Sequence, residues 1–482
     1  MTNTHDQAMN YVYQQVLQRL LSFFSRAERT ALQLMIQRVV VAAGGMERIG
    51  EFKVLTIQSG SRDSCYTLAL LRAAQLSIAG RAPATFQLRV ATLRSNSTAS
   101  TALENIYRSC SALFLYDDPR VEVLMVDNRE VLPFNHAVAI SEGGRESNRL
   151  NMLMVGHRRT WHDPLDLWDD GYLATGEFYG QIARWDRGVD ALVSSDSPRQ
   201  QKQFMDGLNR AAAKAGFAMS AQPEISYEQL FARLDALGSD CYREFYLGHD
   251  QPAWRPAEHF EACRRATFID IHDMLVSNLD ERWPLLTEFL KFQPDELTAQ
   301  SGDNEYVSFS ISAHLRGLQA CFVQGRTYEA GIVDYVRRQL VMMRRKQLPE
   351  HAYEQVLQAY GNPDQRELAA AEAQRCLGLN EAQLVCLLFA PFVEKGASLE
   401  YFLRQCHPGM LVALPELHRA MQGKPAPEQV LQWMVDVSGL PVSLIGTLYR
   451  MGPVASGGTA DKGLQADMRV IDAVTGERST GR

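Results

Sequence analysis

Apolar positions recur at helical spacing at the start of the chain. Within residues 1–50 the apolar side chains repeat every three or four positions, for example at Tyr11, Val16 and Leu20, which predicts amphipathic helices. A Gly-Gly pair at Gly44 marks the end of the second of these helices, because glycine commonly stops a helix. Residues 1–50 are therefore expected to form a helical lead-in.

Between residues 51 and 195 the pattern changes to shorter apolar runs. The runs "TFQLRVATL" and "VEVLMVDN" predict strands, "EFKVLTIQ" predicts a short strand or the entry to a loop, and "CYTLALLRAAQLSIAG" and "STASTALENIYRSCSALF" predict helices. We also interpret "FNHAVAIS" and "RLNMLMVG" as strands, joined by a hairpin loop at "EGGRESN". This region thus begins with helices and ends with a series of strands. That order is typical of an α+β fold and differs from the alternation of helices and strands in a doubly wound sheet.

A polar segment at residues 193–203 reads as a linker, and helical patterns dominate the chain beyond it. Runs such as "RPAEHFEACRRATFIDIHDMLVSNLDERW", "GIVDYVRRQLVMMRRKQ" and "NEAQLVCLLFAPFVEKG" predict helices over residues 204–451. No fixed period recurs, so a repeat array is not indicated. Residues 452–482 contain many glycines and threonines, and we expect a flexible tail.

Composition restricts the class of protein. With 482 residues, 46% hydrophobic and 22% charged, the chain is long enough for two or three domains. A net charge of −7 argues against a nucleic-acid binder. The sequence shows no signal peptide and no uninterrupted apolar run of membrane-spanning length, so we expect a protein of the bacterial cytoplasm without a transmembrane segment.

The eight cysteines are scattered and form no C-x-x-C pair. A metal site is therefore not expected, and neither is an organic cofactor, since no glycine-rich phosphate-binding motif is present.

One cysteine has a distinctive position. Cys65 follows a strand and a polar loop and opens a predicted helix that Ser61, Asp63 or Ser64 could cap. Because the start of a helix stabilises a thiolate, Cys65 is a candidate nucleophile.

A thiol nucleophile needs a base and an orienting group. His136 begins the predicted strand "FNHAVAIS", and Asp163 follows the next predicted strand in "RTWHDPLDLW". If these strands were antiparallel neighbours, the imidazole and the carboxylate would meet. Gln58, upstream of Cys65, could donate its side-chain amide to an oxyanion. Alternatives remain open: Asp166 or Asp127 for the orienting carboxylate, and His162 for the base.

This order of Gln, Cys at a helix start, His on a strand and Asp before Pro resembles the papain-like cysteine protease superfamily. The "D-P-x-x-x-W" ending is similar to the transglutaminase-like branch and to papain-fold toxins and effectors that bacteria deliver into host cells. The resemblance implies a papain-like module over residues 51–195. It also implies Cys65 as nucleophile, His136 as base, Asp163 as its partner and Gln58 as oxyanion donor.

The implied function is a thiol-dependent hydrolase that cleaves a peptide bond or a glutamine side-chain amide in a protein substrate. The effector branch further implies export into a host cell by a route that needs no signal peptide. Residues 204–451 would recognise the substrate or a partner. The alternative is a non-enzymatic helical adaptor in which the α+β module is a scaffold. A basic helix is a candidate contact for an anionic surface through Arg337, Arg338, Arg344 and Arg345.

Overall fold

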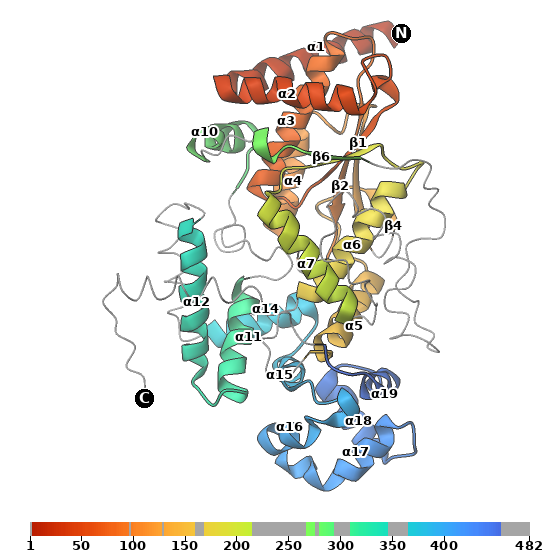
Figure 1. Cartoon of the computed structure of the whole chain (residues 1–482), viewed down its shortest axis with the longest axis vertical. Helices are drawn as coiled ribbons and strands as arrows, with labels where there is room; N and C mark the ends of the chain where they lie inside the picture. Colours follow the sequence, from red (N-terminus) through yellow and green to blue (C-terminus); the bar gives the residue numbers. More distant parts are fainter. Residues whose placement is uncertain are drawn as a thin grey trace, which may run out of the picture.

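The structure is a computed structural model of the chain. It describes residues 2–95, 98–127, 130–159, 168–214, 267–274, 279–293, 309–345 and 365–454. Helices and strands alternate as far as residue 270, and helices make up most of the described part of the chain beyond it (Figure 1).

A mixed sheet of six strands forms the centre of the first half. The spatial order is β4-β3-β2-β1-β5-β6, and all neighbouring pairs are parallel except β3 and β4. The strands are β1 (Lys53–Ile57), β2 (Gln87–Leu93), β3 (Val121–Asp127), β4 (Glu130–Pro133), β5 (Ala191–Ser194) and β6 (Thr267–Asp270). The chain thus builds the sheet outward from β1 in one direction through β2 and β3. It then returns to the other side of β1 to add β5 and β6.

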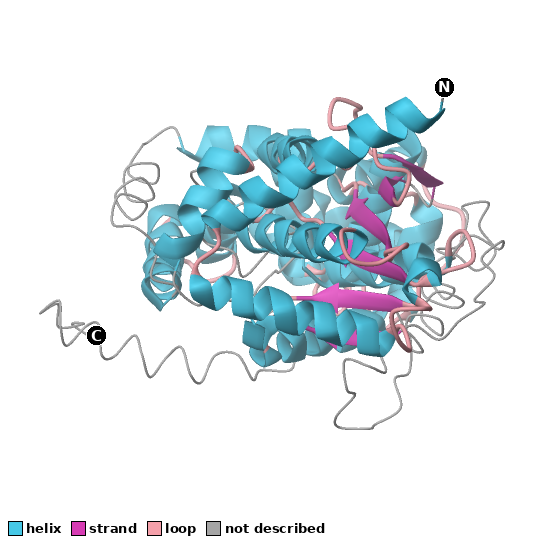
Figure 2. Cartoon of the chain, turned by 90° about the horizontal axis from the view of Figure 1, so that it is seen from above, coloured by secondary structure: helices cyan, strands magenta, loops and turns pink. Residues whose placement is uncertain are grey.

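Helices cover both faces of this sheet (Figure 2). The side chains of a strand point alternately to its two faces. In β1, Val54 packs into a core with the first four helices, whereas Leu55 packs into a second core with the next three. The first set is α1 (Thr2–Phe23), α2 (Arg26–Ala42), α3 (Arg62–Ala79) and α4 (Ser100–Ala112). The second set is α5 (Glu142–His157), α6 (Trp168–Arg184) and α7 (Pro198–Lys214). The result is a three-layer, doubly wound arrangement.

The helices of the second half share the core of the second face. Leu150 and Leu153 on α5 belong to the same cluster of buried side chains as Leu384 and Ile445, so the sheet and these helices form one continuous hydrophobic interior. These helices are α11 (Phe309–Phe322), α12 (Tyr328–Arg345), α14 (Gln365–Leu377), α15 (Glu381–Phe389), α16 (Leu399–Cys406), α17 (Leu414–Met421), α18 (Glu428–Ser438) and α19 (Val442–Arg450). The exception is α10 (Leu279–Pro284), whose Trp283 packs against the core of the first face. Figure 1 shows α16–α19 at the end of the molecule opposite α1 and α2.

The prediction of a mixed helix-and-sheet fold is confirmed. The sequence did not indicate a doubly wound sheet, but all neighbouring strands except β3 and β4 are parallel. Several single elements also differ from the prediction. The run "RLNMLMVG", expected to be a strand, lies in α5, and its supposed hairpin loop is the first part of that helix. The Ser141 side chain accepts a hydrogen bond from the backbone N–H of Gly144 and so caps α5. A short, continuous apolar run has no period that separates a buried strand from a buried helix, which explains the error.

Two further expectations are wrong. The run "FNHAVAIS" is not a strand: the Asn135 side chain accepts a hydrogen bond from the backbone N–H of Ala137, which closes a turn around His136. The long helix expected from residue 255 onward is also wrong in part, because Thr267–Asp270 forms β6 and joins the sheet beside β5. The α/β part therefore extends beyond the predicted boundary at residue 195. The predicted tail beyond residue 454 lies outside the described residues.

Candidate functional site

Cys65 lies at the start of α3, as the sequence predicted. The Ser61 hydroxyl accepts a hydrogen bond from the backbone N–H of Ser64 and caps the helix. The Cys65 side chain, however, is fully buried. Burial raises the pKa of the thiol to about 11, against the smaller opposing effect of hydrogen bonds with Ser109 and Ser64. The thiol is therefore protonated and inaccessible in this structure.

His136 lies on a different face of α4. Its ring stacks on the exposed ring of Tyr107 at 4.1 Å between centroids, and its Nε2 lies 3.6 Å from the Glu104 carboxylate. The thiol of Cys65 instead contacts Ser109 on the buried face of α4. Tyr107 and Ser109 are two positions apart, about 200° around the helix axis. The body of α4 thus separates the imidazole from the thiol, and the predicted pair does not meet.

The other predicted site residues do not complete a triad. The Gln58 side-chain amide donates to the backbone carbonyl of Ser64 at 3.1 Å, so its N–H is already used within the loop. Asp127 accepts hydrogen bonds from the backbone N–H and the hydroxyl of Ser141 and does not orient a histidine. Asp163, Asp166 and His162 lie outside the described residues.

A different site follows from the topology of the sheet. The connections from β1 and from β5 run to opposite faces, so the carboxyl ends of these two adjacent parallel strands diverge. Open α/β sheets bind ligands in the crevice above such a switch point. Here such a crevice would lie between the loop from Gln58 to Ser61 after β1 and the segment from Ser195 to Ser197 after β5.

Gly60 fixes the loop after β1. Its φ of +74° falls in the left-handed region, and a Cβ at this position would lie 2.2 Å from the backbone oxygen of Ala102 in the first turn of α4. The Asn105 side chain donates to the Gly60 carbonyl at 3.5 Å and to the Gln293 carbonyl at 2.8 Å. A glycine is therefore required here, because only glycine allows this backbone conformation and this close approach.

The loop also gathers serine hydroxyls. The Ser59 hydroxyl lies 3.0 Å from that of Ser61 and 3.4 Å from that of Ser64. The Gln58 side chain is almost fully buried, and its Oε1 has no hydrogen-bond partner in the described part of the chain. The loop is thus rich in polar groups at the point where a ligand would approach.

Asp196 is the principal titratable group on the β5 side of the crevice. Burial raises the pKa of its carboxyl group; a hydrogen bond with Ser194 opposes the shift, and the charges of Asp63 and Asp270 add to it. Asp63 lies 3.5 Å from Arg282, Asp270 accepts hydrogen bonds from Gln201 and from the backbone of His272, and the charge of His272 opposes the pKa shift of Asp196. A perturbed carboxyl group beside a cleft is a typical mark of a functional site.

These residues escaped the sequence analysis for identifiable reasons. Asp196 stands in the stretch "VSSDSPRQQKQ", which reads as a linker because β5 before it has only four residues. Asn105 lies within a regular helix, and its partner Gln293 is 188 positions away. The signal that could have located Asp196 is the apolar run "ALV" ending in Ser194, which is typical of a short buried strand.

The described residues contain no group of three or more His, Cys, Asp or Glu side chains arranged to hold a metal ion.

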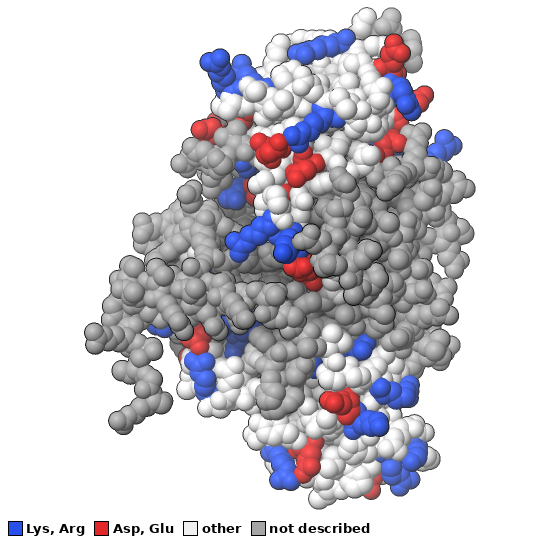
Figure 3. Space-filling view, viewed as in Figure 1, with Lys and Arg blue, Asp and Glu red and all other residues white. Residues whose placement is uncertain are grey.

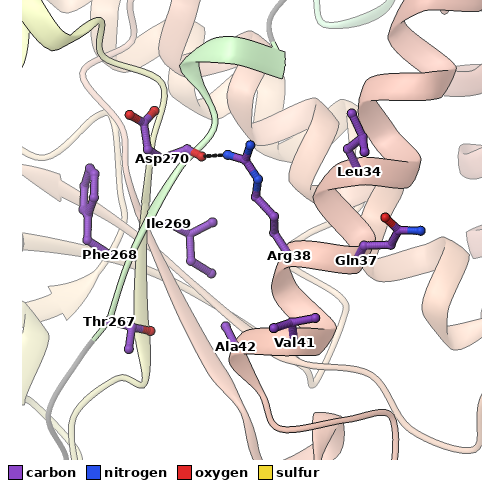
Figure 4. A pocket seen from close by; sticks show the side chains of 9 residues that line it. All are labelled: Leu34, Gln37, Arg38, Val41, Ala42, Thr267, Phe268, Ile269 and Asp270. Atoms are coloured by element: carbon purple, nitrogen blue, oxygen red, sulfur yellow. Dashed lines mark hydrogen bonds between the residues drawn. The ribbon is translucent and has the colours of Figure 1, made fainter.

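A separate groove of about 530 Å³ lies between α2 and the edge strand β6 (Figure 4). The Arg38 side chain extends across it to the backbone carbonyl of Asp270 and pairs with the Asp273 carboxylate at 2.7 Å. Its lining includes the exposed side chains of Leu34 and Val41. We assign the functional site to the switch point instead, since the charge of Arg38 that crosses this groove is already paired.

Comparison with known proteins gives no further guidance: no family model, no curated protein and no solved structure matches the chain. None of the helices described is by itself both long enough and apolar enough to cross a membrane, and α18 and α19 satisfy that test only as a pair bent by 76°.

Proposed function

We propose that the α/β part of this chain binds a small, nucleoside-containing ligand in the crevice above β1 and β5. The observation that supports this most directly is the strand order: β1, β2 and β3 lie on one side of the switch point and β5 and β6 lie parallel to them on the other, as in a doubly wound nucleotide-binding sheet with fewer strands in its second half. This is an inference from fold to ligand class. The residues at the crevice refine it.

The loop after β1 disfavours a pyrophosphate in the usual position. In dinucleotide-binding folds, glycines in this loop leave open space so that the backbone can approach the pyrophosphate. Here the space beside Gly60 is filled by the backbone of Ala102 on α4. A carboxylate at Asp196 also opposes further anionic groups in this region. A nucleoside part without a pyrophosphate fits these constraints better.

Asp196 is the residue that we expect to bind the ligand directly. Its carboxylate can accept hydrogen bonds from ligand hydroxyl or amine groups. Desolvation strengthens such bonds, since they form in a region of lower dielectric constant than water. The serine hydroxyls of the loop after β1 can both donate and accept, and so can hold further polar atoms of the ligand.

The test is a binding screen on the full chain. Isothermal titration calorimetry against adenosine, guanosine, cytidine and uridine, and against ATP and NAD⁺, is expected to detect a nucleoside and to show weaker binding of the compounds that carry a pyrophosphate. Asp196→Asn is expected to weaken the binding by about 10- to 100-fold, because a hydrogen bond to a charged group contributes about 1.5–3 kcal/mol. Asp436→Asn, an exposed carboxylate on α18, is the control and should bind as the unmodified chain does. Equal affinities in the two variants, or no binding by any compound, would refute the proposal.

Thiol-dependent hydrolysis of a peptide or glutamine amide is the second candidate function. One observation favours it: Cys65 lies in the first turn of α3, where the helix dipole stabilises a thiolate. It would require a rearrangement that exposes the thiol and brings His136 around α4. The structure as described has neither feature, so we rank this function below ligand binding.

Alkylation separates the two candidates. We expect Cys65 to resist iodoacetamide at about pH 7.5 in the native chain, because its side chain is buried and its thiol pKa is raised to about 11. Among the cysteines that the structure describes, the partly exposed Cys376 should react before Cys65 when the modified sites are mapped by peptide mass spectrometry. Selective and rapid modification of Cys65 would restore the hydrolase hypothesis.

The helices after β6 could recognise a partner, and this remains a proposal. Arg338 on α12 donates from its side chain to the backbone carbonyl of Asp334, and the side chains of Arg344 and Arg345 lie outside the description. In the described part of the face in Figure 3, Lys and Arg side chains are mixed with Asp and Glu. This mixture favours a protein partner over an anionic surface. A membrane-flotation assay with anionic vesicles tests the latter, and delivery into a host cell stays a prediction.

A further inference from the structure

A histidine is buried where α5 meets the C-terminal helices, by which we mean α15 to α19. His157 is the last residue of α5, its side chain is fully buried, and neither ring nitrogen has a hydrogen-bond partner in the described part of the chain. Its ring lies 5.5 Å from the ring of Phe392, which follows α15. A histidine in this setting must be neutral, since a buried, unpaired charge is very costly.

The surroundings of His157 attach α5 to the C-terminal helices. Arg159 donates to the backbone carbonyls of Leu387 and Leu388 at the end of α15. Arg158 donates to the carbonyl of Gly452 and accepts from the backbone N–H of Val454, both just after α19. His157 therefore occupies the centre of the junction.

Further contacts extend the junction along α5. A Cβ added at Gly156 would lie 3.1 Å from the Leu387 side chain, so the two surfaces are closely packed. About two turns earlier in α5, Arg149 donates to the Gly439 carbonyl after α18 at 2.8 Å. These contacts pack α5 closely against the C-terminal helices.

We propose that His157 makes the attachment of the C-terminal helices to α5 sensitive to pH, so that the contact loosens as the solution becomes mildly acidic. Protonation would place a second positive charge beside the Arg159 guanidinium, with no acceptor for the new N–H. Separation of the two surfaces returns the imidazole to water, where the positive charge is readily accommodated. Protons therefore favour the separated state.

The other charged groups at this junction do not compensate for the imidazolium. Glu394 and Lys395 after α15, and Arg450 on α19, are exposed. Tyr449 on α19 is engaged with His418, and the charged side chains of α6, which also packs on α5, lie outside the description. Burial first, and then the charge of Arg159, lower the pKa of His157 to about 3 from its ordinary 6.5.

The direction of the effect follows from this shift. Between pH 6.5 and about 3 the separated state binds one more proton than the attached state. The attachment is therefore at full strength above about pH 6.5 and weakens by about tenfold for each pH unit below it. From pH 7 to pH 5 the expected change in the attachment equilibrium is about 25-fold.

Hydrogen exchange on the full chain tests the proposal. Amide protection in α15 and α19, corrected for the intrinsic pH dependence of exchange, is expected to fall by about 25-fold from pH 7 to pH 5. Protection in α3, on the other face of the sheet, should change much less. If α3 loses protection by the same factor, the chain is unfolding globally and the proposal is wrong.

Variants identify the responsible group. His157→Phe fills the same space beside Phe392 without a titratable group and should abolish the pH dependence in α15 and α19. If this variant does not fold, His157→Leu serves the same purpose. His418→Gln is the matched control: His418 is a partly exposed histidine of the C-terminal helices, bonded to Tyr449, and its loss should leave the change of about 25-fold intact. A His157 variant that retains the wild-type pH dependence, or a wild-type chain without any, overturns the proposal.

Discussion

Gly60→Ala is expected to lower the free energy of unfolding by about 2–5 kcal/mol. Two costs add. A residue with a Cβ at a φ of +74° costs about 1–2 kcal/mol, and the new methyl group would overlap the backbone of Ala102, which cannot move without shifting α4. Urea denaturation followed by circular dichroism measures the loss. The same variant should also lose nucleoside binding at temperatures where it is folded, since the loop after β1 would be displaced.

Gly423→Ala separates the two costs. Gly423 has the same φ of +74°, but no atom lies within 4 Å of an added Cβ. This control should lose only about 1–2 kcal/mol, from the backbone conformation alone. The difference between the variants then measures the contact between the loop and α4. Equal losses would mean that α4 yields to the methyl group and that Gly60 is not required for a close approach.

The local part of this site could be predicted from the sequence. The apolar run that forms β1, the polar loop after it and the start of α3 all have short-range signals. The structure decides between the alternatives that these signals leave open: the run forms a strand, and Ser61, not Asp63 or Ser64, caps α3. Such signals depend on side chains that interact with their own backbone or with neighbours one turn away. These local signals predicted that Cys65 lies in the first turn of α3, and the structure confirms this placement.

The arrangement of these parts could not be predicted. A hairpin between the runs "FNHAVAIS" and "RLNMLMVG" would bring His136 and Asp163 together, but the second run lies in α5, and a turn at Asn135 takes the place of the first strand. Asp196 comes near Asp63 because β5 pairs with β1, so that the carboxyl ends of the two strands lie at the same edge of the sheet. β1 lies 137 positions earlier in the chain than β5. Strand pairings over such distances depend on the whole fold, so they cannot be predicted from the composition or the periodicity of the two segments alone.

The second large effect concerns a buried ion pair that joins α3 to the segment before β3. Arg72 and Asp118 are both fully buried, with 2.8 Å between Nη1 of the guanidinium and the carboxylate. The remaining N–H groups of Arg72 donate to Gln75 and to the backbone carbonyls of Leu113 and Phe114. Burial alone would raise the pKa of the Asp118 carboxyl, but its bonds with Arg120 and Arg72 outweigh this and lower it.

Asp118→Ala should lower the free energy of unfolding by about 3–5 kcal/mol, because it leaves the Arg72 charge buried without its partner. The double variant Arg72→Met, Asp118→Leu should recover most of that loss, since no unpaired charge remains fully buried: the Arg120 side chain, which also pairs with Asp118, is 28% exposed. Glu400→Ala breaks the exposed pair with Arg404 and should cost less than about 1 kcal/mol. If Asp118→Ala were as mild as this control, water would have to reach Arg72 in the native state.

The pH dependence of the same variants provides an independent check. The carboxyl pKa of Asp118 is lower in the folded chain than its ordinary 3.8, so its contribution to stability is present above pH 3.8 and disappears as the pH falls through the folded value. Denaturation curves of the wild type and of Asp118→Ala should therefore converge below pH 3.8. They should differ by a constant amount near neutral pH. Because His157 acts between pH 6.5 and about 3, the two groups are best separated in the His157→Phe background, where the carboxylate effect remains and the imidazole effect is removed.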